Sequence, residues 1–80
     1  MQITDRQKNI IGILLESEDV ITCKEIAGII KVSDRTVLNE INNINAKLNK
    51  GNKLEIAKGK GIKISNNTTI YELNELYNAP

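Results

Sequence analysis

Hydrogen-bonding side chains are concentrated in residues 33–48 of this 80-residue chain. On a helix, where each residue turns by about 100°, Arg35 and Asn39 lie on one face, and Thr36 and Asn43 flank it. Guanidinium, amide and hydroxyl groups form hydrogen bonds to base edges and phosphates, and Arg and Asn can each bind a purine through a pair of such bonds. This face is therefore predicted to contact DNA through Ser33, Arg35, Thr36, Asn39 and Asn43.

The same segment has the pattern of a helix with one buried side. Its apolar residues recur at spacings of i, i+4, i+7 and i+11 and form one stripe, which consists of Val37, Ile41, Ile44 and Leu48. Ser33 is expected to cap the helix, and the N–H groups that follow it favour an anion such as a phosphate. Because Gly51 suits the left-handed position after a helix end, the helix is predicted over residues 34–49.

Two shorter helices are predicted before this one. Each opens with a capping box, in which a threonine is followed three residues later by Gln or Glu. The boxes place one helix from residue 4 to about residue 17 and another over residues 23–30, with a short strand at residues 20–21 between them. A tight turn at residues 31–32 joins the second helix to helix 34–49, which is the pattern of a helix-turn-helix.

After the long helix the pattern changes from helical to alternating. Polar and apolar residues alternate on both sides of a Gly-Lys-Gly tip, which predicts a β-hairpin over residues 53–65. Lys58 and Lys60, near the tip, are expected to contact phosphates or the minor groove; the alternative is that they are ordinary turn lysines. The side chains expected to face the core are Leu54, Ile56, Ile62 and Ile64.

The last segment carries one further helical stripe. A capping-box spacing from Thr69 to Glu72 places the helix start after a loop at residues 66–69. The stripe either closes the core below the hairpin, contacts a second copy of the chain or begins a linker to another domain; it consists of Ile70, Leu73, Leu76 and Tyr77. We therefore predict a domain at residues 1–65 and a C-terminal helix at residues 66–80 that serves as a dimer contact or a linker.

Composition limits the chain to one small aliphatic core. Apolar residues make up 40% of the sequence, and Phe and Trp are absent. The net charge is only +1, but residues 24–64 carry nine basic and four acidic side chains, and the segments on either side each have a net charge of −2. This basic middle favours an anion-binding surface, and an ordinary solvated surface is the alternative.

Several classes of function are not expected. The single cysteine, Cys23, leaves no internal disulfide and fits a reducing cytoplasm, and we interpret it as a small helix residue rather than a redox site. The absence of histidine excludes a His-based general base and argues against zinc. The sequence shows neither a long apolar run nor a signal peptide. We therefore expect a cytoplasmic protein that is not an enzyme and needs no cofactor, metal or membrane.

Two motifs together resemble a known module: the segment Val32-Ser33-Asp34-Arg35-Thr36-Val37 and the tip Gly59-Lys60-Gly61. They are similar to the winged helix-turn-helix domain of bacterial transcription regulators, in particular sugar-operon activators controlled by the phosphotransferase system and the biotin repressor. The resemblance runs from about Arg6 to Ile64. With the elements above, it predicts an α+β fold with a three-helix core, a short strand, a two-stranded wing and an extra C-terminal helix.

The resemblance implies sequence-specific binding to double-stranded DNA, and a homodimer fits the family. It carries Ser33, Arg35 and Thr36 to the start of the recognition helix, and Lys58 and Lys60 to the wing.

Leu38 departs from the pattern of these regulators, in which basic or polar residues are common at this position. It is expected either to pack on a neighbouring helix or to touch a thymine methyl group. The departure also leaves an alternative function open, a winged helix that binds another protein through Leu38 and the Asn-rich face. RNA binding is disfavoured, because the only aromatic residues, Tyr71 and Tyr77, are not predicted on that face.

Overall fold

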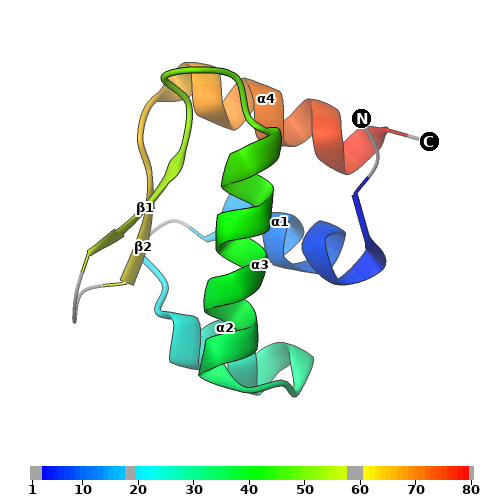
Figure 1. The fold of residues 1–80 in the computed structure, drawn as a ribbon, viewed down its shortest axis with the longest axis vertical. Helices are drawn as coiled ribbons and strands as arrows, with labels where there is room; N and C mark the ends of the chain where they lie inside the picture. The colour runs from blue at the N-terminus through cyan, green and yellow to red at the C-terminus, as the bar shows by residue number, and fades with distance from the viewer. Residues whose placement is uncertain (1–2, 18–19, 58–60, 80) are drawn as a thin grey trace.

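The long central helix lies between the other elements in a computed structural model that describes residues 3–17, 20–57 and 61–79. Figure 1 shows this helix, α3, along the long axis, with α2 at its amino end, α4 across its carboxyl end and the hairpin to one side. The described elements confirm the predicted α+β winged helix: α1 (Asp5–Glu16), α2 (Cys23–Ile30), α3 (Asp34–Lys47), β1 (Leu54–Ala57), β2 (Gly61–Ile64) and α4 (Asn67–Asn78).

Side-chain caps define the starts of the first three helices, as predicted. Thr4 and Thr22 both form complete capping boxes, with Gln7 and Glu25 as the reciprocal partners. The Ser33 hydroxyl accepts a hydrogen bond from the backbone N–H of Thr36 at 3.1 Å. Each cap satisfies an N–H group that has no partner inside its helix. Local sequence therefore determines where these helices begin.

The end of α3 was predicted incorrectly. The helix stops at Lys47, two residues before the predicted end at residue 49, and Leu48 is its C-cap in an extended conformation. Gly51 has a positive φ of 91°, but it lies in a following turn in which Asn52 donates to the Asn49 carbonyl at 2.9 Å. The turn is held from a distance by Glu72 of α4, whose carboxylate accepts from the Asn49 N–H at 3.0 Å. The contact between Glu72 and Asn49 lies outside α3 in the sequence, so the position of Gly51 alone did not predict where the helix ends.

The hairpin has the predicted position, and an asparagine attaches it to α3. Leu54 pairs with Ile64, and Ile56 pairs with Ile62. Asn45 of α3 forms two hydrogen bonds with the backbone of Leu54, accepting from its N–H at 2.8 Å and donating to its carbonyl at 3.0 Å. The predicted strand at residues 20–21 is reduced to an isolated bridge between Ile21 and Ile62.

Burial along the hairpin corrects one prediction. Leu54 and Ile62 are each 2% exposed, and Ile64 is half-buried, as expected for core-facing positions. Ile56 was also expected to face the core, yet it is 41% exposed. Its partner Ile62 is covered because Ile21 bridges β2 on its other side, whereas Ile56 lies on β1, the outer strand of the hairpin. Lys58 and Lys60 lie outside the described residues, so their predicted contacts are not tested.

The core is aliphatic, as the composition predicted. Its buried side chains are Ile10, Ile11, Leu14, Ile26, Ala27, Val37, Ile41, Ile44, Leu54, Ile62, Leu73 and Leu76. The predicted stripe of α3 contributes three of these, and Leu48 packs against them half-buried. Among the described residues, the buried polar side chains are Gln7 and Thr69, and both form hydrogen bonds.

The C-terminal helix starts earlier than predicted. Its N-cap is Asn66, so α4 begins at Asn67, and the predicted loop at residues 66–69 is mostly its first turn. Thr69 is buried inside this turn and bonds to Asn66 and Ser65. Asn66 acts as the cap because its side-chain amide oxygen accepts a hydrogen bond from the Thr69 N–H at 2.8 Å.

The turn between α2 and α3 contains a strained residue. Lys31 has φ 60° and ψ 52°, the left-handed conformation that costs non-glycine residues about 1 kcal/mol or more. We expect Lys31→Gly to raise the free energy of unfolding by about 0.5–1 kcal/mol, because glycine adopts this conformation freely. Urea unfolding of the two proteins measures the difference. An unchanged or lowered midpoint would show that the turn is not strained.

Candidate nucleic-acid interface

The outward face of α3 carries most of the predicted contact residues. Arg35, Asn39 and Asn43 are exposed, and so is Asn42, a helical neighbour of Asn39. Thr36 is half-buried. The opposite side of the helix is buried in the core, so the polar row is held in a fixed orientation toward solvent.

Ser33 and Thr36 bind one another at the leading end of α3. Besides the capping bond, their hydroxyl groups lie 2.9 Å apart and share a hydrogen bond. Ser33 is exposed, so its cap does not prevent an outside group from reaching it. Arg35 lies one residue before Thr36 and is therefore presented in the first turn of the helix, beside N–H groups that favour anions.

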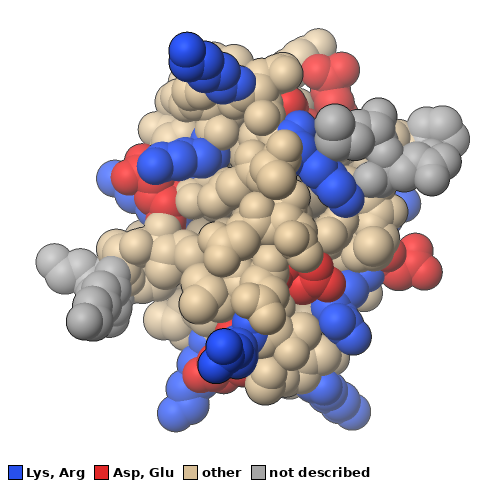
Figure 2. Space-filling model, in the orientation of Figure 1, with Lys and Arg blue, Asp and Glu red and all other residues tan. Residues whose placement is uncertain are grey.

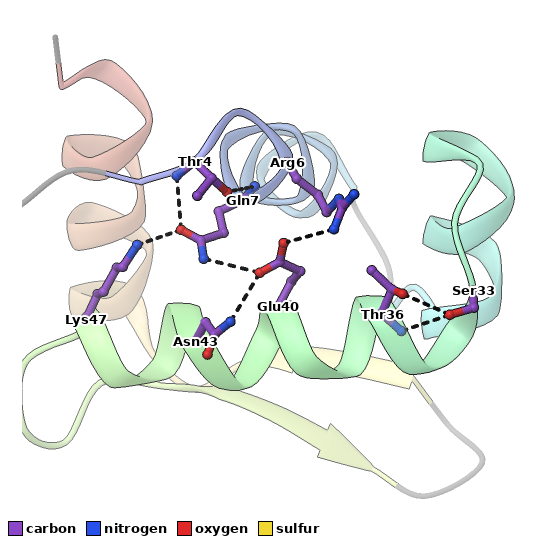
Figure 3. A network of polar contacts seen from close by, with 8 residues as sticks. All are labelled: Thr4, Arg6, Gln7, Ser33, Thr36, Glu40, Asn43 and Lys47. Carbon is purple, nitrogen blue, oxygen red and sulfur yellow. Dashed lines mark hydrogen bonds and ion pairs between the residues drawn. The ribbon is translucent and has the colours of Figure 1, made fainter.

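A polar network fixes α3 against α1 (Figure 3). The Gln7 amide nitrogen donates to Glu40 at 3.2 Å, and the Gln7 carbonyl accepts from the Lys47 ammonium at 2.6 Å. Arg6 adds an ion pair with Glu40 at 3.6 Å. Gln7 is only 4% exposed. Sequence reasoning recognised Gln7 as a capping residue but missed this second role, because its partners lie 33 and 40 residues away.

The network also determines how Asn43 is presented. Its amide nitrogen donates to the Glu40 carboxylate at 3.3 Å. Since an ionised carboxylate only accepts hydrogen bonds, the nitrogen rather than the oxygen of Asn43 must face Glu40. The Asn43 carbonyl oxygen and its second N–H remain for an outside partner. An acceptor at this position suits the exocyclic amino group of cytosine or adenine.

An open hollow lies beside the polar row, between α3, β1 and the start of α2. Its volume is about 540 Å³, and it is lined by Cys23, Asp34, Arg35, Leu38, Asn39 and Ile56. Burial raises the pKa of the Cys23 thiol, and the nearby Asp34 carboxylate raises it further. Both effects disfavour the thiolate, in agreement with our interpretation of Cys23 as a small helix residue. Sequence reasoning did not foresee that Leu38 and Ile56 share a hollow.

Charged side chains surround this face instead of covering it. Figure 2 shows lysines and arginines projecting around the edge with acidic side chains among them, whereas most of the middle, where α3 lies in Figure 1, is uncharged. Such a distribution suits a duplex, because phosphates flank the groove and base edges form its floor.

The three helices, the tight turn and the hairpin define a winged helix-turn-helix domain. A family model described as an HTH domain matches residues 6–63, and the chain belongs to that family. Membership points to a DNA-binding regulator in a class that is typically not enzymatic. No curated protein and no solved structure matches the chain. The narrower resemblance to sugar-operon activators and the biotin repressor stays a prediction.

Two absences among the described residues concern other kinds of site. No helix in the described part of the chain has the length and apolar character needed to cross a membrane. Residues 3–17, 20–57 and 61–79 contain no group of three His, Cys, Asp or Glu side chains placed to hold a metal ion.

Proposed function

We propose that the chain binds specific sequences of double-stranded DNA as the DNA-binding module of a bacterial transcription regulator. The observation that carries this proposal is the exposed polar row of α3, which contains Arg35, Asn39, Asn42 and Asn43 beside a hairpin. A helix about 10–12 Å across fits a major groove about 12 Å wide. In the proposed complex, α3 lies in that groove.

The hairpin supplies the second contact in the proposal. Lys53 and Lys63 are exposed on its two sides, and Lys58 and Lys60 lie near its tip in the sequence. Lysine provides compact positive charge that binds phosphates without reading sequence. The wing at residues 53–65 therefore contacts phosphates or the minor groove and increases the affinity for any duplex.

The direct test is selection of bound sequences from a random duplex pool, followed by binding measurements at several salt concentrations. We expect an enriched motif whose affinity falls steeply with salt, because bound phosphates release counterions. Failure to bind any duplex at low salt would overturn the proposal.

Arg35→Ala is expected to weaken binding to the selected duplex by about 1–3 kcal/mol and to relax preference at one base pair, because arginine reads guanine through paired hydrogen bonds. Lys60→Ala is the matched control, because loss of a phosphate contact is expected to weaken binding to all duplexes alike. Fluorescence anisotropy on selected and scrambled duplexes separates the two patterns. Equal losses on both duplexes for Arg35→Ala would contradict its role in base reading.

A homodimer is part of the proposal, since two-fold DNA sites require two recognition helices. The structure narrows the predicted dimer contacts. Leu73 is fully buried and Leu76 is 8% exposed, so both already pack in the core. Ile70 and Tyr77, at 38% and 37% exposed, are the remaining candidates. Cytoplasmic location and control by the phosphotransferase system rest on the resemblance and the composition alone.

Protein assembly is the second candidate function. The exposed pair Leu38 and Ile56 favours it, because apolar surface is more common in protein interfaces than in phosphate contacts. A partner-binding module would bind no selected duplex, and its binding to the partner would be lowered by Leu38→Ala and unaffected by Arg35→Ala. Tight binding to a selected duplex that Arg35→Ala weakens supports DNA readout instead.

A further inference from the structure

Two large apolar side chains are left partly uncovered in the hollow beside α3. Leu38 of α3 is 39% exposed, Ile56 of β1 is 41% exposed, and both line the same hollow of about 540 Å³. A single exposed hydrophobic residue is ordinary in a folded protein. Leu38 and Ile56 come from separate elements and line the same hollow, so together they form a small apolar surface between α3 and β1.

That location is continuous with the proposed base-reading row. Leu38 lies three residues after Arg35 and four before Asn42, spacings that make residues neighbours on the surface of a helix. Arg35 and Asn39 themselves line the hollow. A group that occupies the hollow therefore also meets hydrogen-bonding side chains.

The lining indicates a base edge rather than a phosphate. Asp34 and Arg35 both line the hollow, so their opposite charges leave it with no net attraction for an anion, and Leu38 and Ile56 offer phosphates no hydrogen bond. The edges of the base pairs in the major groove carry one apolar group, the 5-methyl group of thymine. Neutral, partly apolar and flanked by hydrogen-bonding atoms, the thymine edge matches this surface.

We propose that Leu38 and Ile56 receive the 5-methyl group of a thymine and thereby specify that base. The proposal rests on the proposed DNA binding and deepens it. It assigns a specificity-determining role to Leu38, at a position where the regulators that the chain resembles commonly carry a basic or polar residue. The wing then recognises a base through Ile56, in addition to binding phosphates through its lysines.

The test uses the full 80-residue chain and the strongest duplex from the random pool. Each thymine is replaced in turn by uracil, which lacks only the methyl group. We expect one replacement to weaken binding about fourfold, the value of one buried methyl-sized group, with the others close to neutral. In Leu38→Ala the thymine and uracil duplexes should bind equally at that position.

Two further variants separate the contact from general effects. Leu38→Met keeps an apolar side chain of similar volume and should retain the preference for thymine. Tyr71→Ala removes a side chain that is 66% exposed on α4, outside the hollow, and should leave the preference unchanged. Thermal unfolding of each variant checks that the domain is intact.

The outcomes are distinguishable. Tight binding that is indifferent to every uracil replacement overturns the thymine contact and leaves DNA binding intact. The thymine contact is also overturned if Leu38→Ala weakens binding to the thymine and uracil duplexes by the same factor. The preference for thymine would then persist without Leu38. Recovery of no duplex from the pool overturns the proposed function together with this inference.

Discussion

Replacing Gly61 with alanine is expected to lower the free energy of unfolding by about 3–5 kcal/mol, from strained backbone and overpacking together. Gly61 has φ +97°, and an added Cβ would lie 2.8 Å from the Ile21 carbonyl oxygen and 2.7 Å from Val20 Cγ1. The carbonyl cannot move freely, because it accepts the Ile62 N–H at 2.7 Å. A domain of this size is typically stable by about 4–12 kcal/mol, so we expect a substantial unfolded fraction in urea at low concentration.

Gly51→Ala is the matched control for this prediction. Gly51 has nearly the same backbone angle, φ +91°, but nothing lies within 4 Å of a Cβ built there. Its cost is therefore that of the left-handed conformation alone, about 1–2 kcal/mol. Equal losses in the two variants, measured by urea unfolding, would show that backbone conformation rather than the Ile21 contact explains the need for Gly61.

The glycine comparison shows what the sequence can reveal. A Gly-Lys-Gly tip between alternating segments predicts a hairpin that needs positive φ, and Gly61 indeed has it. Nothing in that pattern indicates that a carbonyl from residue 21 lies against the same glycine. Backbone preference is local, whereas the close approach depends on how α1, α2 and the hairpin pack together.

The same distinction between local preference and tertiary packing applies to the ends of the helices. The starts at Thr4, Thr22 and Ser33 were predictable, because each cap bonds only three residues ahead. The stripe of α3 was predictable because its period fixes which side is buried. The start of α4 was not, since Asn66 and Thr69 are both good caps by residue type and burial of Thr69 decides between them.

The candidate site was predicted in part for a related reason. Exposure of Arg35, Asn39 and Asn43 follows from the helical pattern, and the structure agrees. The hydrogen bond from Asn43 to Glu40 is local, because the two residues are neighbours on α3, whereas the contacts of Gln7 and Arg6 with the same carboxylate depend on the packing of α1 against α3. The hollow between Leu38 and Ile56 likewise requires the angle between α3 and β1, which no sequence spacing encodes.

Leu73→Ala is expected to cost about 3–5 kcal/mol of unfolding free energy, the range for a leucine removed from a packed core. Leu73 is 0% exposed and belongs to the same cluster as Ile10 and Ile41. A further tie comes from Glu72, whose carboxylate accepts from the Asn52 amide at 2.8 Å and holds the loop after α3. Chemical unfolding followed by circular dichroism measures the loss. Tyr71→Ala, at a neighbouring position that is 66% exposed, is expected to cost less than about 0.5 kcal/mol.

The way in which the unfolding midpoint depends on protein concentration shows whether α4 packs in the core of its own chain or contacts a second copy. If Leu73 stabilised the chain by contacting a second copy, the unfolding midpoint would rise with protein concentration, and Leu73→Ala would abolish that rise. A core role predicts the same loss at every concentration. A dimer through Ile70 and Tyr77 would still raise the wild-type midpoint with concentration, and Ile70→Ala rather than Leu73→Ala would remove the dependence. The pair of variants therefore separates the packing of α4 on its own domain from its proposed contact with a partner.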